Sequence, residues 1–196
     1  MADIDPKNLF FTQTDLDLQQ AVKFTENALH SADDGELYLE YTLSEAFSFD
    51  DNRLKAASFD TAQGFGLRAV NDEAVGYAHA TDLSPAALKR AADSLAPVLS
   101  GHQGTWAQSP SVAGSPLYVA ENPLDSAGFT DKVALLNEIN AYTRACDNRV
   151  RQVSVALSGE WQAVGIIRPD SAPVFDIRPL VRLDVSVVVG EGDRQE

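Results

Sequence analysis

The chain has 196 residues, 44% hydrophobic and 22% charged, a composition typical of a globular protein with a substantial core. Its 29 acidic and 15 basic residues give a net charge of −14, and lysine and arginine never cluster, which argues against direct binding of nucleic acid. Apolar runs are too short to span a membrane and the N-terminus is acidic, so we expect a cytoplasmic protein without membrane contact.

The first hundred residues predict helices around a meander of strands. A helix over residues 15–29, capped by Thr14 or Asp15, is expected because apolar residues recur on one of its faces. Alternating apolar and polar residues predict strands over 36–43, 47–49, 53–59, 64–70 and 74–80, with turns at 50–52 and 71–73. Ser84 and Pro85 then begin a second helix, which Pro97 should bend or end early.

The composition changes to Gly, Ser, Pro and Gln over residues 101–116, which is typical of a connector. We therefore divide the chain into a subdomain at 1–100, a connector at 101–125 and a second subdomain at 126–196. In the second subdomain, Thr130 is expected to cap a helix whose apolar stripe is Leu135, Ile139, Tyr142 and Cys146. Strands follow at 149–157, 161–167 and 174–189, separated by turns at 158–159 and 169–173.

Strands come in antiparallel-like runs with helices between them, without strict alternation of strand and helix. This order favours an α+β fold of two small subdomains, each with helices packed on a mainly antiparallel or mixed sheet. The last strand alternates apolar residues on one face with Arg182, Asp184 and Ser186 on the other, so it needs partners. Only a short polar tail follows it, and we expect the chain to be one part of something longer.

Motifs of chemical function are absent from the sequence. The three histidines (His30, His79 and His102) stand alone, with no second His or Cys at metal-ligand spacing, and the acid pairs at 33–34 and 50–51 have turn contexts. Cys146 falls on the predicted apolar stripe of a helix, which favours a small core residue. We therefore expect neither a catalytic residue nor a metal ligand, and no cofactor, in this chain.

One strand carries glycines at alternate positions, in Gln63-Gly-Phe-Gly-Leu-Arg68. Such glycines remove side chains from one face, which suits either close packing of neighbouring structure or the approach of an extended peptide. A phosphate loop would need a third glycine and a following helix. The candidate substrate-binding residues are Gln63, Gly64, Gly66 and Arg68. Arg178 and Arg182 are further candidates for binding the carboxylate of a peptide. The alternative is that both arginines simply face solvent.

Several short motifs follow one another in a distinctive order: Gly35-Glu-Leu-Tyr-Leu-Glu40, Arg53-Leu-Lys-Ala-Ala-Ser58, Gln63-Gly-Phe-Gly-Leu-Arg-Ala-Val70, Gly76-Tyr-Ala78, Ser115-Pro-Leu-Tyr118, Val153-Ser-Val-Ala-Leu-Ser-Gly159 and Arg178-Pro-Leu-Val-Arg-Leu-Asp-Val-Ser-Val187. Their order and spacing over residues 35–196 resemble the N-terminal part of the TldD/PmbA family. The older name of that family refers to modulation of DNA gyrase.

The resemblance implies a cytoplasmic zinc metallopeptidase that acts on small or unfolded peptides. Members of the family hold zinc with a His-Glu-x-x-x-His helix and a later cysteine, and the glutamate is the general base. These residues have no counterpart in this chain, and Cys146 does not match the ligand cysteine. The resemblance thus implies a scaffold and substrate-access domain, inactive by itself, with a TldE/PmbA-like partner subunit or self-association.

An alternative from another class is a stand-alone interaction module that binds a partner or peptide by sheet-edge pairing. The two hypotheses differ in their surfaces. Part of a larger enzyme should leave an apolar surface uncovered, whereas a module should have blunted edges and remain monomeric.

Overall fold

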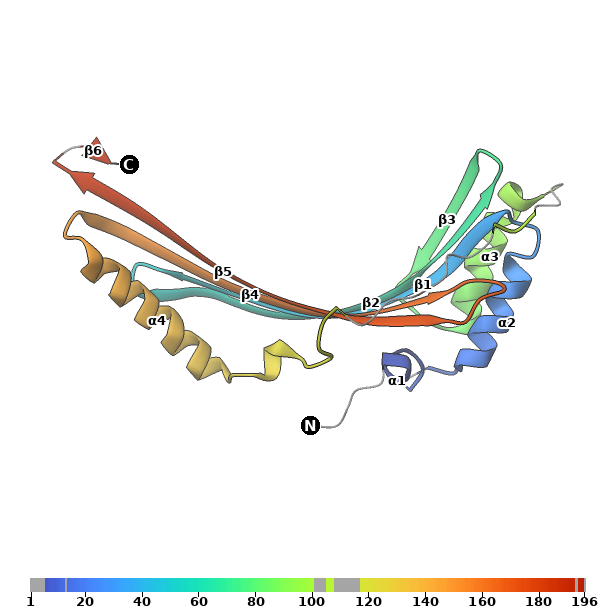
Figure 1. The fold of residues 1–196 in the computed structure, drawn as a ribbon, viewed down its shortest axis with the longest axis horizontal. Helices are drawn as coiled ribbons and strands as arrows, with labels where there is room; N and C mark the ends of the chain where they lie inside the picture. Colours follow the sequence, from blue (N-terminus) through green and yellow to red (C-terminus); the bar gives the residue numbers. More distant parts are fainter. Residues whose placement is uncertain (1–5, 13, 101–104, 108–116, 193, 196) are drawn as a thin grey trace. The chain divides into compact units, whose positions relative to one another are not determined.

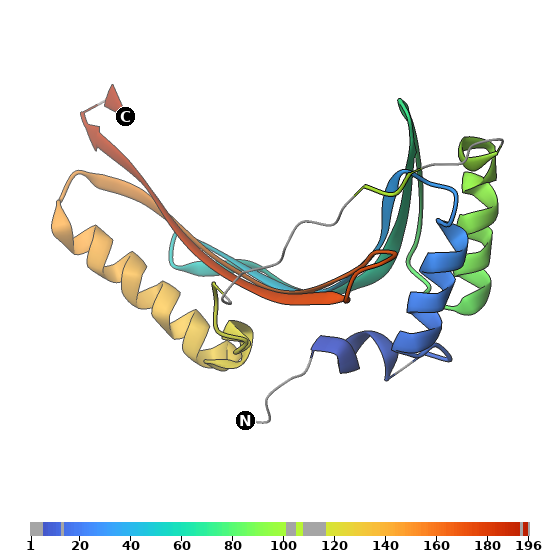
Figure 2. The ribbon, with the colours of Figure 1, turned by 45° about the vertical axis from the view of Figure 1, so that its right-hand side comes forward.

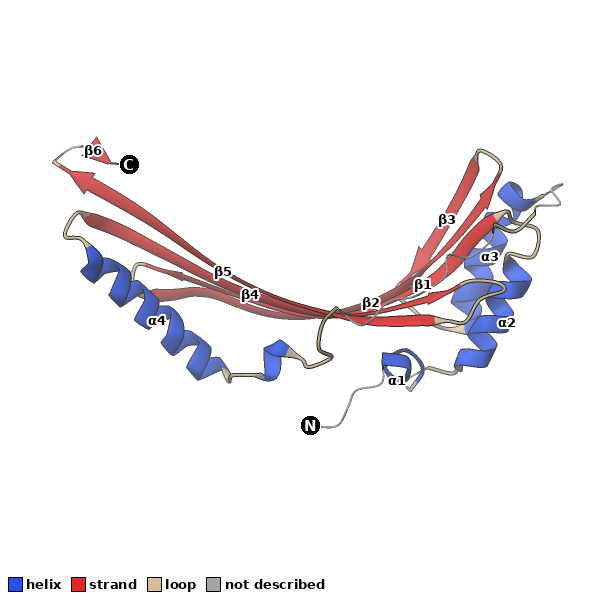
Figure 3. Cartoon of the chain, in the orientation of Figure 1, coloured by secondary structure: helices blue, strands red, loops and turns tan. Residues whose placement is uncertain are grey.

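The computed structural model describes residues 6–12, 14–100, 105–107, 117–192 and 194–195. Its elements follow the order α1, α2, β1, β2, β3, α3, η1, α4, β4, β5 and β6 (Figure 1). The strands form an antiparallel sheet in the order β3-β2-β1-β4-β5-β6 (Figure 3). Along the chain, helices and strands occur in separate runs and do not alternate one by one. The predicted α+β class is confirmed.

Four of the strands are long: β1 is Asp34–Asp50, β2 is Arg53–Asn71, β4 is Val150–Ile167 and β5 is Val174–Glu191. The other two, β3 at Ala74–Ala80 and β6 at Arg194–Gln195, are short. The division of β1, β2 and β4 into two strands each was wrong, and so was the turn at 158–159. A Cβ on Gly159 would lie 2.5 Å from Leu124 Cδ2, so this glycine allows close packing within a continuous strand.

The remaining predicted turns are present, and the backbone explains their residues. Asp51, Asn52, Asp72 and Asp170 have positive φ angles of 49°, 65°, 50° and 61°. Asp and Asn tolerate this left-handed region better than other side chains do. Acidic and amide residues therefore mark the places where β1, β2 and β4 turn back.

The chain forms two compact units, each assembled from three segments. The first unit comprises Met1–Thr42, Ala62–Ala120 and Gln162–Arg178, and the second comprises Leu43–Thr61, Glu121–Trp161 and Pro179–Glu196. These units are defined by contacts in space. A division along the chain at residues 101–125 remains a proposal.

In the first unit, helices α2 (Leu18–Ala28) and α3 (Pro85–Leu99) lie on one face of the sheet (Figure 2). Leu37, Leu39 and Leu67 are completely buried on the strands beneath them. Gly76 of β3 lets α3 approach, because a Cβ there would lie 2.7 Å from Leu95 Cδ2. These two helices therefore cover one face of the strands of this unit (Figure 2).

Local sequence signals predicted the ends of these helices approximately, but not to the exact residue. Helix α2 begins after Asp17, which forms a capping box with Gln20, so the predicted cap at Thr14 or Asp15 was wrong. Ser84 caps α3 as predicted, with its side chain accepting from the Ala87 amide. Helix α3 contains Pro97 and ends only at Leu99. A short helix, α1 (Pro6–Phe11), was not predicted.

In the second unit, helix α4 (Phe129–Cys146) covers a cluster of buried side chains: Phe47, Phe49, Leu136, Val153 and Val155. A single turn, η1 (Pro123–Asp125), precedes it. Gly128 is the cap of α4, so the prediction of Thr130 was wrong. The predicted apolar stripe was also wrong, because Leu135, Tyr142 and Cys146 are exposed and the buried positions are Lys132, Leu136 and Asn140.

Candidate functional site

The predicted glycine motif lies on β2 within the first unit. Gly64, Gly66 and Arg68 alternate along the strand and share the face opposite the helices, whereas Gln63 is an exposed neighbour. The register with β3 places Gly66 opposite His79 and Arg68 opposite Tyr77. The motif and β3 therefore form one continuous surface.

Close packing accounts for both glycines. A Cβ on Gly64 would lie 2.7 Å from the backbone oxygen of Ala80, and one on Gly66 would lie 2.5 Å from Tyr77 Oη. The exposed ring of Tyr77 thus rests over Gly66 and stacks with His79, with 5.7 Å between the ring centroids. This is the close-packing alternative of the sequence analysis; the assignment of both glycines to peptide binding remains a proposal.

Arg68 belongs to a cluster of ion pairs at one end of this surface. Its Nε lies 2.6 Å from Glu36 Oε1, and its Nη2 lies 2.9 Å from Asp34 Oδ2. Arg168, which follows β4, pairs with the same two carboxylates. We call Asp34, Glu36, Arg68 and Arg168 the arginine–carboxylate cluster. It joins the ends of β1, β2 and β4 and its formal charges cancel.

The cluster shifts the titration of its members. Burial raises the pKa of Asp34, but hydrogen bonds from Arg68 and Arg168 outweigh it and hold this pKa below its ordinary value. The hydrogen bond to Glu36 raises the pKa of Arg68, which stays fully charged. Nearby on β1, burial and then the hydrogen bond to Glu40 raise the pKa of Tyr38 to about 12.

Trp106 completes the cluster from a distant part of the chain. Its ring centroid lies 5.9 Å from Arg168 Cζ, a cation–π contact. Asp33 holds residues 105–107 in place through two hydrogen bonds. Its Oδ1 accepts a hydrogen bond from the Thr105 amide at 3.0 Å, and its backbone oxygen accepts one from the Ala107 amide. Sequence reasoning missed Asp34, Glu36, Arg168 and Trp106 as a group, since they are far apart along the chain.

The two remaining candidates do not join this cluster. Arg178 pairs with Asp176 at 2.9 Å, and Arg182 pairs with Asp184 at 2.7 Å, each two residues away on β5. Arg178 belongs to the first unit and Arg182 to the second. Both side chains are at least half exposed, so each remains accessible to a carboxylate.

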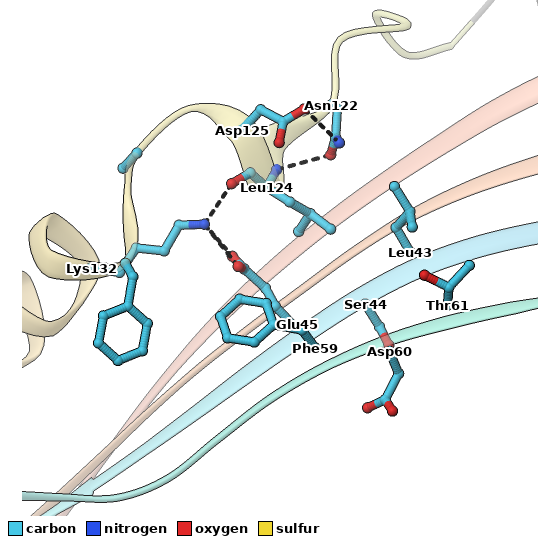
Figure 4. A pocket seen from close by; sticks show the side chains of 12 residues that line it. Leu43, Ser44, Glu45, Phe59, Asp60, Thr61, Asn122, Leu124, Asp125 and Lys132 are labelled. Atoms are coloured by element: carbon cyan, nitrogen blue, oxygen red, sulfur yellow. Dashed lines mark hydrogen bonds and ion pairs between the residues drawn. The ribbon is translucent and has the colours of Figure 1, made fainter.

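The second unit has a pocket of about 310 Å³ between η1, α4 and the strands (Figure 4). Lys132 and Glu45 meet at its base with an Nζ to Oε1 distance of 2.6 Å, and their side chains are only 8% and 6% exposed. Lys132 also donates to the Leu124 carbonyl oxygen. Sequence reasoning missed this pair, because a lysine on a helix normally faces solvent.

Side chains that can bind a metal are dispersed through the described ranges. Among these residues, His, Cys, Asp and Glu do not gather in any group of three that could hold a metal ion. The chain thus does not fit a zinc site within its described part. In the same residues, every helix is too short or too polar to cross a membrane.

Two family models match the chain. Residues 35–96 match the PmbA/TldA metallopeptidase domain 1, and residues 122–196 match the PmbA/TldA metallopeptidase central domain. A "Metalloprotease TldD homolog" of Haemophilus influenzae is 34% identical over 194 residues, which is 96% of this chain and 40% of that protein. A protein of the same name from Buchnera aphidicola (Schizaphis graminum) is 29% identical, over 85% of this chain and 35% of its own length.

Solved structures agree at the level of the fold. TldE from Thermococcus kodakarensis superposes with a TM-score of 0.70 at 17% identity, covering 91% of this chain and 40% of that one. A candidate modulator of DNA gyrase from Bacteroides thetaiotaomicron gives a TM-score of 0.71 at 13% identity, covering 90% and 41%. The matched domains and relatives together show that the chain belongs to the PmbA/TldD metallopeptidase family and corresponds to its N-terminal part.

Proposed function

We propose that this chain is the scaffold and substrate-access part of a TldD-like zinc metallopeptidase that processes small, unfolded peptides. The proposal is supported by the family and by the chain's span of 35% and 40% of the two curated relatives described above. The zinc and its general base would belong to the rest of the protein. The described residues of this chain would then enclose and guide the peptide without a bond-breaking role.

The observation that carries the proposal is an uncovered apolar stripe on β5 in the second unit. Five alternating residues share one face of the strand and are all exposed: Val181, Leu183, Val185, Val187 and Val189. Such a stripe is unfavourable in water, with a free-energy cost of about 25 cal/mol per Å² of apolar surface. A further part of the same protein would cover it.

The first unit offers the surface that would face a peptide. Gln63 is exposed on β2, and Tyr77 and His79 present stacked rings beside Gly66. Arg68 is already paired with Asp34 and Glu36, so we assign it the role of holding this surface in place. Arg178 and Arg182 remain the proposed contacts for a peptide carboxylate.

The partner would be a TldE/PmbA-like subunit or a second copy, and the location cytoplasmic. A TldE structure is among those with this fold. We propose neither nucleic-acid nor membrane contact, given the net charge of −14. The alternative, a stand-alone interaction module, is disfavoured by the exposed β5 stripe, because a module would bury or blunt it.

The test uses the 196-residue chain and matched variants on opposite faces of β5. The chain should hydrolyse no peptide with or without zinc, and should bind a hydrophobic dye and self-associate through the stripe. Val185→Asp should abolish both properties, whereas Ser186→Asp, on the opposite face, should leave them unchanged. Zinc-dependent turnover by the purified chain, or equal behaviour of the two variants, would overturn the proposal.

A further inference from the structure

An unpaired stretch of strand borders the pocket of the second unit. The pairs between β2 and β3 run from Phe65 opposite Ala80 to Asn71 opposite Ala74. Residues 53–61 of β2 lie beyond this ladder, and within the described ranges no further strand follows β3 in the sheet order. All of them except Leu54 are exposed. Their outward N–H and C=O groups are a template for an additional strand.

The pocket opens beside this free edge. Phe59 and Thr61 of β2 line it together with Leu43, Leu124 and Phe129. In Figure 4, Phe59 and Thr61 lie on the pocket side, while the carboxylate of Asp60 extends away from Lys132 and Glu45. A strand paired with β2 would therefore place alternate side chains next to the pocket.

The charged groups of the pocket favour a hydrogen-bond donor. The three hydrogens of the Lys132 ammonium are directed at both Glu45 oxygens and the Leu124 carbonyl, so none is left for an anion. The carboxylates of Glu45 and Asp125 keep further lone pairs, because each oxygen accepts two hydrogen bonds. Asp125 has one such bond, from Asn122 Nδ2 at 3.0 Å.

Charge and aromatic contacts favour a cation. The charged residues that line the pocket are Glu45, Asp60 and Asp125 against Lys132, which leaves two net negative charges. Phe59 and Phe129 are 60% and 49% exposed, and their ring centroids lie 6.4 Å apart. Exposed aromatic faces stabilise an ammonium or guanidinium and pack against its aliphatic stem.

We propose that residues 53–61 of β2 bind an extended peptide as an added strand, and that the adjoining pocket takes a lysine or arginine side chain of that peptide. The backbone of the peptide forms hydrogen bonds with the unpaired N–H and C=O groups of β2, and its basic side chain donates hydrogen bonds to the carboxylates of the pocket. This site is distinct from the glycine motif. It requires no hydrolysis and no other part of the protein, so it can fail or succeed independently of the proposed function.

The experiment measures binding of short fluorescent peptides to the 196-residue chain by anisotropy. The peptides alternate threonine and valine around a central lysine, norleucine or glutamate. The lysine peptide should bind about tenfold more tightly than the norleucine peptide, and the glutamate peptide should bind least. N-methylation of alternate backbone amides should abolish binding, since it removes the donors of the ladder.

Variants locate the site. Phe59→Ala and Asp125→Asn should each weaken the lysine peptide about fivefold to tenfold while the fold, followed by circular dichroism, is kept. Val75→Ala is the matched control, because Val75 is equally exposed on β3 in the other unit. Absence of binding, equal binding of all three peptides, or no effect of Phe59→Ala and Asp125→Asn would overturn the proposal.

Discussion

Replacement of Lys132 by methionine tests the role of the buried ion pair in the second unit. The change removes the ammonium and leaves the carboxylate of Glu45 buried without its partner. Because both side chains are more than nine-tenths buried, solvent screening does not reduce the effect. We expect a loss of about 3–5 kcal/mol, to which the lost hydrogen bond to Leu124 contributes about 1 kcal/mol.

Such a loss is a large part of the stability of a typical domain, which is about 5–15 kcal/mol. Urea unfolding followed by circular dichroism should show a midpoint lowered by about 2 M, for a slope of about 2 kcal/mol/M. The double variant Glu45→Gln/Lys132→Met should recover most of the loss, because no isolated charge remains. Lys55→Met, at an exposed position of β2, is the control. A cost for Lys132→Met no greater than that of Lys55→Met would refute the reasoning.

Three further predictions concern local geometry and charge. Gly35→Ala places a Cβ 2.3 Å from the Arg68 backbone oxygen and should lower the free energy of unfolding in urea by about 2–3 kcal/mol. Gly66→Ala meets only the movable end of the Tyr77 side chain, so its cost should be less than about 1 kcal/mol. Equal costs for the two variants would contradict this. Burial raises the pKa of Asp34, but the arginine hydrogen bonds lower it further, so its stabilisation is present above about pH 3.8 and lost as pH falls below that value. The urea midpoint should therefore fall less steeply with acid in Asp34→Asn than in the native chain, and parallel curves would count against the cluster. Asn52 has a φ of 65° and its Oδ1 accepts a hydrogen bond from the buried Asn140 amide, so Asn52→Gly should cost about 1 kcal/mol through the lost hydrogen bond, and Asn52→Val about 1–2 kcal/mol more by the same assay because valine disfavours this φ.

Local patterns predicted the parts of the fold that local chemistry determines. Alternation predicted β3 with its bounds, Ser84 predicted the start of α3, and the acidic turns appeared where the backbone needs positive φ. The length of the strands was not predictable in this way. Gly159 has the sequence signature of a turn, yet it lies within the continuous strand β4 and packs closely against Leu124.

The buried face of α4 shows why the rest was missed. Apolar spacing selected Leu135, yet the helix buries Lys132 and Asn140, whose partners Glu45 and Asn52 lie 87 and 88 residues away. Arg168 likewise reaches Asp34 across 134 residues. A polar side chain is tolerated in a core only when a partner is present, and such distant partners leave no periodic trace in the sequence.

The three-segment composition of each compact unit has a genetic consequence. Neither unit corresponds to one uninterrupted stretch of codons, because both draw strands from before and after residues 101–120. A single crossover between related genes therefore cannot exchange one unit as a cassette. Substitutions along β1, β2, β4 and β5 would have to be compatible with both units at once, which favours inheritance of the whole region together.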